Sequence, residues 1–284
     1  MVTESGKLYV VATPIGNLAD MTFRAVEVLK QVDLIAAEDT RHIAQLLQHY
    51  GISNKLMSLH QYNEDKASAT VLEKLRGGLS IALVSDAGTP LLSDPGMPLV
   101  KMVKDAGLSV VPIPGACALI TALSAAGLPV TQFSFEGFLP RTSSARKAFF
   151  TERALQPTTW IFYESCHRIL ACLQDMAQVI PLSRQIVIAR ELTKLHETIV
   201  KTSLGEAVEL VANNDMMRKG EFVVVVDGHI AEDRAQLLTL EQEQTLQILL
   251  RECSIKTAVA LAVELTGAKK KLLYQAALVM QNAH

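Results

Sequence analysis

The first 113 residues alternate short apolar runs with segments whose apolar residues recur at helical spacing. The apolar runs predict strands at 8–12, 34–37, 55–59, 81–84 and 109–112. The segments between them predict helices at 21–31, 43–50, 66–75 and 98–106, as the spacing of Phe23, Val26 and Leu29 illustrates. Strands that alternate with helices in this way are typical of a mostly parallel sheet with helices on its faces.

The pattern changes after residue 113, where the connections become shorter and hairpins are expected. Strands are predicted at 133–137, 158–163, 185–189, 197–201 and 222–226, with helices at 116–126, 145–154, 169–179 and 204–213. This second sheet is expected to be mixed. The polar segment 227–235 is typical of a linker, and helices at 245–252, 256–265 and 269–280 follow it.

The fold class is therefore α/β, and three domains are expected. An N-terminal α/β domain covers 1–113, a second α/β domain 114–230, and a small helical domain 236–284. Thr266-Gly267 separates the last two helices at a spacing like that of a helix-turn-helix. The same spacing also suits plain helical packing, which is the commoner case.

Charge and cysteine content exclude several classes of protein. The net charge is −2 and 49% of the residues are hydrophobic, so the chain can bury a large core but is not basic overall. A nucleic-acid partner would therefore have to be held by local positive patches. The four cysteines lack metal-ligand spacing, so we expect no metal site and a reducing, cytoplasmic setting. The uncharged stretch 106–135 is broken by prolines, and we expect no membrane association.

The segment Ser85–Gly96 is the strongest candidate for a ligand-binding loop. It follows a predicted buried strand and contains two glycines, two prolines and two aspartates. Glycine lets the backbone approach a ligand closely, and proline fixes φ. In open α/β sheets, ligands bind at the carboxyl ends of the strands, where this loop lies.

Other strand-end loops extend this candidate site, while three common signatures are missing. The sequence contains no G-x-G-x-x-G, no G-x-x-x-x-G-K-[ST] and no G-x-S-x-G. Dehydrogenase, kinase and hydrolase functions are thereby disfavoured. A pocket lined by loop backbone suits an adenosine-bearing ligand, whose base and ribose need donors and acceptors. The further loops are 13–16, 38–41, 114–116, 162–165 and 190–194.

Together these loops resemble the tetrapyrrole methylase superfamily, and within it the enzymes that methylate a cytidine ribose of 16S ribosomal RNA. The segments that carry the resemblance are 11–18, 37–41, 84–96, 114–115, 136–141, 162–165 and 190–194. The resemblance implies S-adenosylmethionine bound in a cleft between two α/β domains. It also implies a homodimer that transfers a methyl group to a cytidine 2′-hydroxyl near the decoding centre, in free RNA or in the small ribosomal subunit.

The resemblance also assigns cofactor-binding residues. Most of them come from the strand-end loops: Pro14, Ile15, Asp86, Thr89, Leu92, Gly115, Ala116, Phe162, Ala189 and Glu221. Where relatives have Gly-Asp-Pro, this chain has Gly88-Thr89-Pro90, and an acid stands instead at Asp86.

Catalysis requires in-line approach of the oxygen to the methyl group, and a general base would help because a ribose hydroxyl is a weak acid. Glu38, Asp39 and Glu164 are the candidate catalytic carboxylates, with Arg41 as a neighbouring cation. Two structural alternatives stay open: Asp39 and Arg41 could pair only to order a loop, and Glu164 could cap a helix near Arg168.

Candidate RNA-binding cations fall into three groups. Arg141, Arg146 and Lys147 follow a Gly-Phe-Leu-Pro turn, Arg168 and Lys194 lie in strand-end loops, and Lys269, Lys270 and Lys271 open the last helix. Phosphate contacts dominate RNA affinity, although a solvated face would also explain the lysines. Methylation of a tetrapyrrole or other small molecule, and a non-catalytic RNA-binding module, are the alternative functions.

Overall fold

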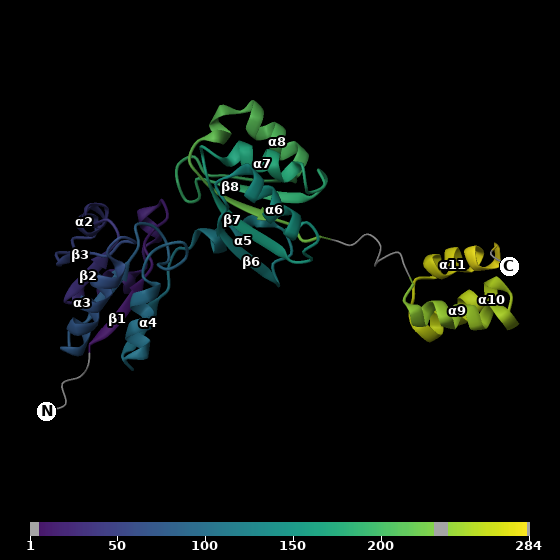
Figure 1. The fold of residues 1–284 in the computed structure, drawn as a ribbon, viewed down its shortest axis with the longest axis horizontal. Coiled ribbons are helices and arrows are strands. Elements are labelled where there is room, and N and C mark those ends of the chain that lie inside the picture. The colour runs from purple at the N-terminus through teal and green to yellow at the C-terminus, as the bar shows by residue number, and fades with distance from the viewer. Residues whose placement is uncertain (1–5, 230–237, 283–284) are drawn as a thin grey trace. The chain divides into compact units, whose positions relative to one another are not determined.

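The computed structural model describes residues 6–229 and 238–282. The chain divides into two compact units, Met1–Gly228 and His229–His284. The first unit holds two five-stranded sheets with their helices, and the second is helical (Figure 1).

The first sheet has the strand order β3-β2-β4-β1-β5, and every recorded strand pair in it is parallel. This confirms the parallel sheet predicted from the sequence. Its strands are β1 (Lys7–Val11), β2 (Leu34–Ala37), β3 (Leu56–Ser58), β4 (Ile81–Val84) and β5 (Ser109–Ile113). The connecting helices are α1 (Phe23–Gln31), α2 (Thr40–His49), α3 (Glu64–Arg76) and α4 (Met97–Asp105), with a short 3-10 turn, η1 (Leu18–Asp20).

The second sheet has the order β6-β7-β10-β8-β9 and is mixed, as predicted. The pair β6–β7 is parallel, whereas β10 runs antiparallel to both β7 and β8. The strands are β6 (Phe133–Phe138), β7 (Thr159–Ser165), β8 (Gln185–Arg190), β9 (Thr198–Ser203) and β10 (Glu221–Val226). The helices are α5 (Ala118–Ala126), α6 (Ser143–Arg153), α7 (Ile169–Ala177) and α8 (Leu204–Asn213), with the 3-10 turn η2 (Asp215–Arg218).

Helices cover both faces of the second sheet, and strand residues alternate between two cores. Trp160 and Phe162 pack with α6, α7 and α8, whereas Ile161 and Val223 pack with α5. Because successive strand side chains point to opposite faces, this alternation decides which residues can reach a site on the α5 face.

The second unit is a bundle of three helices, α9 (Leu240–Glu252), α10 (Ile255–Thr266) and α11 (Lys270–Asn282). Leu246, Val259 and Leu273 form part of its core. Gly267 ends α10 with φ of +67°, a left-handed conformation that glycine adopts without strain. Among the described residues of the whole chain, no helix has the length and apolar character needed to cross a membrane.

Candidate functional site

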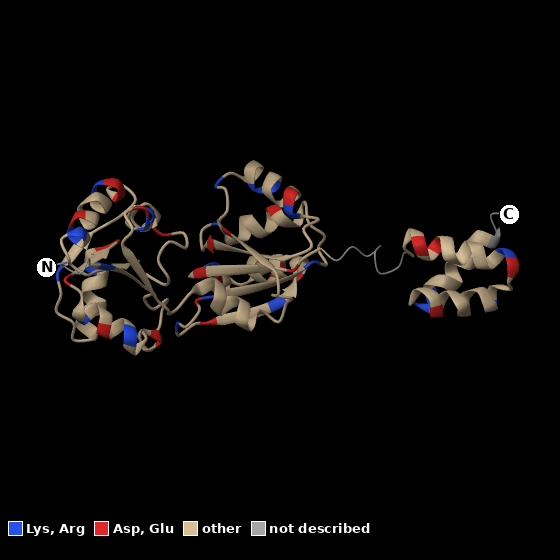
Figure 2. Cartoon of the chain, turned by 90° about the horizontal axis from the view of Figure 1, so that it is seen from below, with Lys and Arg blue, Asp and Glu red and all other residues tan. Residues whose placement is uncertain are grey.

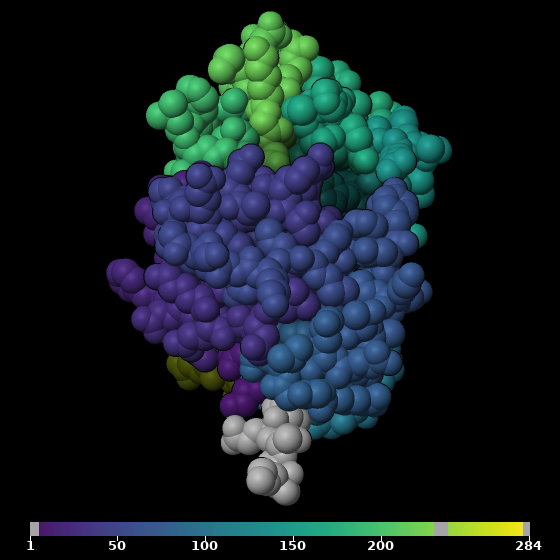
Figure 3. Space-filling model, turned by 90° about the vertical axis from the view of Figure 1, so that its left-hand side faces the viewer, coloured from purple at the N-terminus to yellow at the C-terminus, as the bar shows by residue number. Residues whose placement is uncertain are grey.

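A pocket of about 380 Å³ lies where loops of the two sheets of the first unit meet. The first sheet contributes through its adjacent strands β4, β1 and β5. The segments that follow these three strands supply Ile15, residues 87–89 and 92–94, and Cys117 with Ala118. Because parallel strands end at one edge, three segments that are far apart in sequence form one wall. The surface is hollowed where the blue and teal segments of this unit meet (Figure 3).

The opposite wall comes from one edge of the second sheet. The end of β7, the start of β10 and the end of β8 lie side by side there, since β10 is antiparallel to both neighbours. They supply Tyr163, Ala189, Glu221 and Val223 to the lining. The pocket therefore draws on residues between positions 15 and 223.

The loop Ser85–Gly96 is tied to its neighbours by hydrogen bonds. Thr13 and Gly88 exchange backbone bonds of 2.9 and 3.0 Å, and the Thr89 hydroxyl donates to the carbonyl of Ala116 (3.0 Å). Leu91 and Ser93 adopt φ of 77° and 73°, a region that side-chain-bearing residues occupy only when the surroundings hold them there. The backbone around Leu92 is thus fixed in an unusual shape next to the pocket.

Five of the ten residues expected to bind the cofactor line the pocket: Ile15, Thr89, Leu92, Ala189 and Glu221. Phe162 does not, because it is fully buried and stacks on Trp160 in the core of the opposite sheet face. Its neighbour Tyr163 belongs to the pocket lining instead. Pro14, Asp86 and Ala116 each adjoin a lining residue in the sequence, and Gly115 lies two residues before Cys117, but none of the four belongs to the lining.

Gly115 nevertheless has a clear steric role. A Cβ atom at this position would lie 2.8 Å from the Cβ of Ala12 at the end of β1. Only glycine lets the loop after β5 approach β1 so closely, and this approach keeps Cys117 and Ala118 at the pocket wall.

Three carboxylates gather at the first-sheet edge of the site: Glu38, Asp86 and Asp94. Burial, together with the nearby charges of Asp94 and Asp86, raises the pKa of Glu38. Burial, with a further contribution from Asp86, also raises the pKa of Asp94. Asp86 accepts a 2.9 Å hydrogen bond from the backbone N–H of Asp39 and so joins β2 to β4. Of the three, Asp94 lines the pocket.

Asp39 and Arg41 form an exposed pair at the start of α2. The Arg41 guanidinium donates two bonds to the Asp39 carboxylate (3.1 and 2.7 Å), which also accepts from the Arg41 backbone N–H. These bonds from Arg41 hold the pKa of Asp39 well below its usual range, so this carboxylate is a poor proton acceptor. The loop-ordering alternative describes the pair better than a catalytic one.

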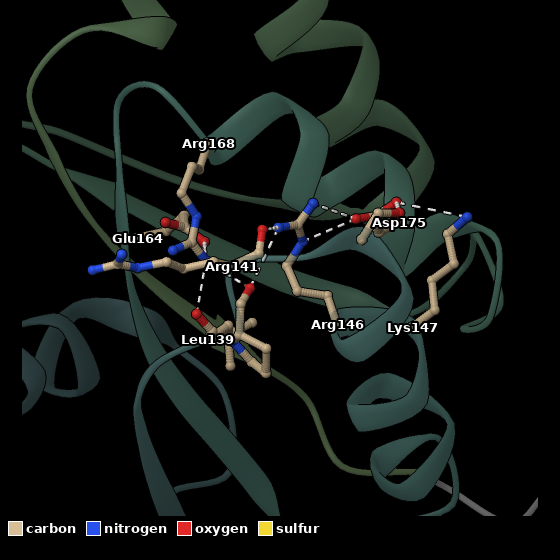
Figure 4. Close-up of polar contacts among 9 residues, drawn as sticks. Leu139, Arg141, Arg146, Lys147, Glu164, Arg168 and Asp175 are labelled. Atoms are coloured by element: carbon tan, nitrogen blue, oxygen red, sulfur yellow. Dashed lines mark hydrogen bonds and ion pairs between the residues drawn. The ribbon is translucent and has the colours of Figure 1, made fainter.

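Glu164 belongs to the pocket lining, but its carboxylate is fully buried on the far side of β7. It lies 3.0 Å from the Arg168 guanidinium and accepts a bond from the Ser165 N–H (Figure 4). A carboxylate held in this way cannot reach a substrate hydroxyl, which corrects the expectation that Glu164 is catalytic.

Arg146 and Arg168 are structural residues, contrary to the expectation that they bind RNA. Arg146 is 5% exposed and is bonded to Asp175 and to the carbonyls of Pro140 and Arg141. Arg168 donates to the carbonyls of Leu139 and Pro140 (2.8 and 3.0 Å). Figure 4 shows both guanidinium groups directed at the 139–141 backbone. We call this set of contacts the arginine clamp.

The remaining predicted RNA-binding cations differ in their surroundings. Lys194 lines the pocket and bonds Glu191 and Glu221, each at 2.8 Å; burial opposes the charge of Lys194, but these two carboxylates raise its pKa overall. Its charge is thus already balanced, which argues against a role in RNA binding. Lys147 is partly exposed, 3.8 Å from Asp175. Arg141, Lys269, Lys270 and Lys271 are exposed.

Comparisons with known proteins identify the class. The model for tetrapyrrole (corrin/porphyrin) methylases matches residues 7–208, and the model for the RsmI C-terminal HTH domain matches residues 236–281. The chain therefore belongs to the tetrapyrrole methylase family, a family of methyltransferases. The second match supports the helix-turn-helix interpretation of the last helices over plain helical packing.

The chain is also similar, over nearly its whole length, to proteins named ribosomal RNA small subunit methyltransferase I. It is 52% identical to that of Escherichia coli O157:H7, over 98% of this chain and 96% of the relative. It is 48% identical to that of Pseudomonas aeruginosa, over 98% and 99%. These values confirm the resemblance drawn from the strand-end loops.

Solved structures share the fold at low sequence identity. The methyltransferase CobJ matches with a TM-score of 0.59 and 20% identity, over 79% of this chain and 95% of that one. A uroporphyrin-III C-methyltransferase from Thermus thermophilus, complexed with S-adenyl homocysteine, matches with a TM-score of 0.52 and 16% identity, over 78% and 97%. These likenesses confirm a fold of two α/β sheets, and family membership supports the expected cofactor, S-adenosylmethionine.

Most of the residues that line the pocket were missing from the predicted site, Asp94 and Tyr163 among them. Asp94 stood in the loop singled out from the sequence, so its position beside two glycines and two prolines was the available signal. Tyr163 follows the apolar run Trp160–Phe162, and this run gives no polar alternation that separates the face of Tyr163 from that of Phe162.

Proposed function

We propose that the pocket binds S-adenosylmethionine and that the protein methylates the 2′-hydroxyl of a cytidine in 16S ribosomal RNA, near the decoding centre. The observation that carries the proposal is a pocket built from the family's strand-end loops in a chain about 50% identical to ribosomal RNA methyltransferases.

The residues of the pocket fit this cofactor chemically. A volume of about 380 Å³ lies within the range of about 300–1,000 Å³ found for small-molecule sites. Ile15, Leu92 and Val223 offer apolar surface to an adenine ring, and Gly88 brings backbone close. Asp94 supplies negative charge that suits a sulfonium or ammonium group. S-adenosylmethionine, when bound, supplies an electrophilic methyl group.

Positioning and charge are then the main contributions of the chain to catalysis. The fixed backbone of 85–96 holds the lining in one geometry, which favours an in-line approach by the ribose oxygen. We assign Asp94 either to accept the proton of the ribose hydroxyl or to balance the positive charge of the cofactor, because it lines the cavity and burial raises its pKa above the ordinary value. Glu38, directly after β2, is a second carboxylate whose pKa is raised by burial and by the charge of Asp94.

RNA would be held by local cations outside the pocket. Lys and Arg residues are interspersed with Asp and Glu along the elements of the α/β unit in the view of Figure 2, so we assign RNA binding to individual cations. Arg141 and Lys147 near the site, with Lys269, Lys270 and Lys271 on the helical unit, are the assigned contacts. A cation at the start of a helix opposes the macrodipole, which favours a functional reason for the three lysines.

A methyl-incorporation assay tests the proposal. The purified chain and labelled S-adenosylmethionine are incubated with unmodified small ribosomal subunits, with free 16S ribosomal RNA, or with a tetrapyrrole precursor. We expect label in RNA, recovered after digestion as 2′-O-methylcytidine. Label in the tetrapyrrole alone, or cofactor binding without transfer to any acceptor, would contradict the proposal.

We further propose a cytoplasmic homodimer, and a boundary between the two α/β domains at 113/114. The boundary separates the last strand of the first sheet from α5, which packs on the second sheet. Sedimentation of the purified chain tests the dimer, since a monomer at micromolar concentration would exclude it.

A further inference from the structure

Phe138 is an exposed aromatic residue in the lining of the pocket. Its side chain is 59% exposed although it belongs to the lining. Single exposed apolar side chains are common on protein surfaces, so it is the position of this ring in the pocket lining, together with its exposure, that makes it available to a bound partner.

A bulge in β6 directs this ring toward the pocket. Phe135 pairs with Ile161 and Phe138 with Tyr163, so β6 advances three residues where β7 advances two. Gly137, with φ of +64°, provides the turn. The extra residue brings Phe138 to the face of Tyr163, whose ring it meets edge-on at 5.7 Å. Bulges next to active sites commonly redirect a side chain in this way.

The backbone on the other side of Phe138 is held by the arginine clamp. Arg168 and Arg146 bind the carbonyls of residues 139–141, and Glu164 and Asp175 balance their charges. The next exposed cation, Arg141, leaves this fixed backbone with its side chain directed away from the clamp (Figure 4). The exposed ring of Phe138 and the exposed guanidinium of Arg141 are thus three residues apart in the sequence, on a backbone that the arginine clamp holds rigid.

We propose that Phe138 stacks on a base of the single-stranded RNA substrate, with Arg141 contacting a neighbouring phosphate; the proposal rests on the proposed function. Sequence-specific recognition of RNA targets single-stranded loops and bulges, whose unstacked bases stack on aromatic side chains. A nucleotide offers a base that can stack on a ring and a phosphate that can bind a cation. An apolar protein surface would use the ring but not the cation. Leu92, also exposed, lines the same pocket from the loop whose Ser93 lies beside Gly137.

Kinetics of full-length variants test the stacking role. In Phe138→Ala we expect the KM for unmodified small subunits to rise about 5- to 150-fold, the range that loss of one stacked base gives, with kcat changed less. Phe138→Trp should restore the KM, whereas Phe138→Leu, which keeps apolar bulk without a ring, should not. Phe133→Ala is the matched control, because Phe133 is an exposed phenylalanine of the same strand outside the pocket lining.

Two further measurements separate stacking from other roles. Cofactor affinity, measured by calorimetry, should be the same in Phe138→Ala and the wild type; a parallel loss of cofactor affinity would assign the ring to the cofactor and overturn the proposal. An RNA oligonucleotide with pyrrolocytidine at the target position should lose fluorescence on binding the wild type but not Phe138→Ala.

The outcomes distinguish the two proposals. A wild type that methylates subunits while Phe138→Ala keeps a normal KM and normal quenching refutes stacking alone. If the wild type quenches the pyrrolocytidine fluorescence through Phe138 but transfers no methyl group to RNA, only the proposed function is refuted.

Discussion

The guanidinium of Arg146 is bonded to the carboxylate of Asp175 through Nε at 2.9 Å, and both side chains are less than 10% exposed. The Ser143 hydroxyl and Lys147 also approach this carboxylate. Burial opposes its charge, but the bonds from Ser143 and Arg146 lower the pKa of Asp175 overall. The pair joins α6 to α7 and holds the turn that precedes α6.

Breaking this pair should strongly destabilise the protein. We expect Asp175→Asn or Arg146→Ala to lower the free energy of unfolding by about 3–5 kcal/mol, because the remaining partner is left buried without compensation. Urea unfolding measures the effect. Lys101→Ala is the matched control: its pair with Asp105 is exposed and should contribute at most about 1 kcal/mol. Equal effects in both variants would contradict this account.

Asp94→Asn should stabilise the protein at neutral pH while weakening function. Burial raises the pKa of Asp94 above its ordinary value, so above the raised pKa the folded state carries an unfavourable buried charge. As the pH falls through that pKa, the native state takes up the proton before the unfolded state does, and the wild type gains stability relative to the variant.

Thermal unfolding across pH checks the sign of this effect. The melting temperature of Asp94→Asn should exceed that of the wild type at pH 7, and the two should converge as the pH falls to about 4, near the ordinary pKa of an aspartate. Cofactor affinity at pH 7 should fall in the same variant. If the variant were less stable than the wild type at pH 7, the charge of the Asp94 carboxylate would be stabilised by a partner in the folded state and not disfavoured by burial.

Gly88→Ala should impair cofactor binding through the shape of the loop. At φ of +85°, a Cβ atom would also lie 3.2 Å from Cγ2 of Ile15 in the pocket wall. We expect the cofactor dissociation constant, measured by calorimetry, to rise about tenfold, which corresponds to about 1.4 kcal/mol. Gly107→Ala is the matched control: Gly107 also has a positive φ (+72°), but a Cβ atom there would meet no atom within 4 Å. This variant should therefore lose stability but keep its cofactor affinity.

Reversing the charge of Lys269, Lys270 and Lys271 should weaken RNA binding and leave cofactor binding unchanged. The three side chains are exposed, so the change should not disturb the core of the helical unit. The dependence of log affinity on log salt should fall by about one for each phosphate that the protein no longer binds. Reversal of three exposed cations elsewhere, Lys66, Arg76 and Lys104, changes the net charge equally and serves as control. RNA affinity that is unaltered at low and high salt would exclude these lysines.

The alternation of strands and helices could be predicted because each element carries its own periodic signal. Several helix starts were missed where the cap lies upstream of the apolar face. The helix α9 begins at Leu240, not at 245, because Thr239 and Gln242 form a capping box, a T-x-x-Q signal that the sequence does contain. Similarly, α2 begins directly after its cap, Asp39.

The site was predictable as a set of loops, but less so as a set of side chains. Residues 160–163 are apolar or aromatic on both faces of β7, so the sequence offers no polar alternation to separate Phe162 from Tyr163. The burial of Arg146 depends on Asp175, which lies 29 residues later, and local patterns carry no information about such a partner.

The position of β10 has a consequence for the synthesis of this protein. This strand is the last of the first unit in the sequence, yet it occupies the centre of the second sheet, between β7 and β8. It also supplies Glu221 and Val223 to the pocket. Until residue 226 has emerged from the ribosome, the nascent chain therefore lacks the strand that pairs with both β7 and β8. One wall of the pocket is then also incomplete. We expect the ability to retain the cofactor to arise in a single late step of translation, after nearly all of the α/β unit has emerged.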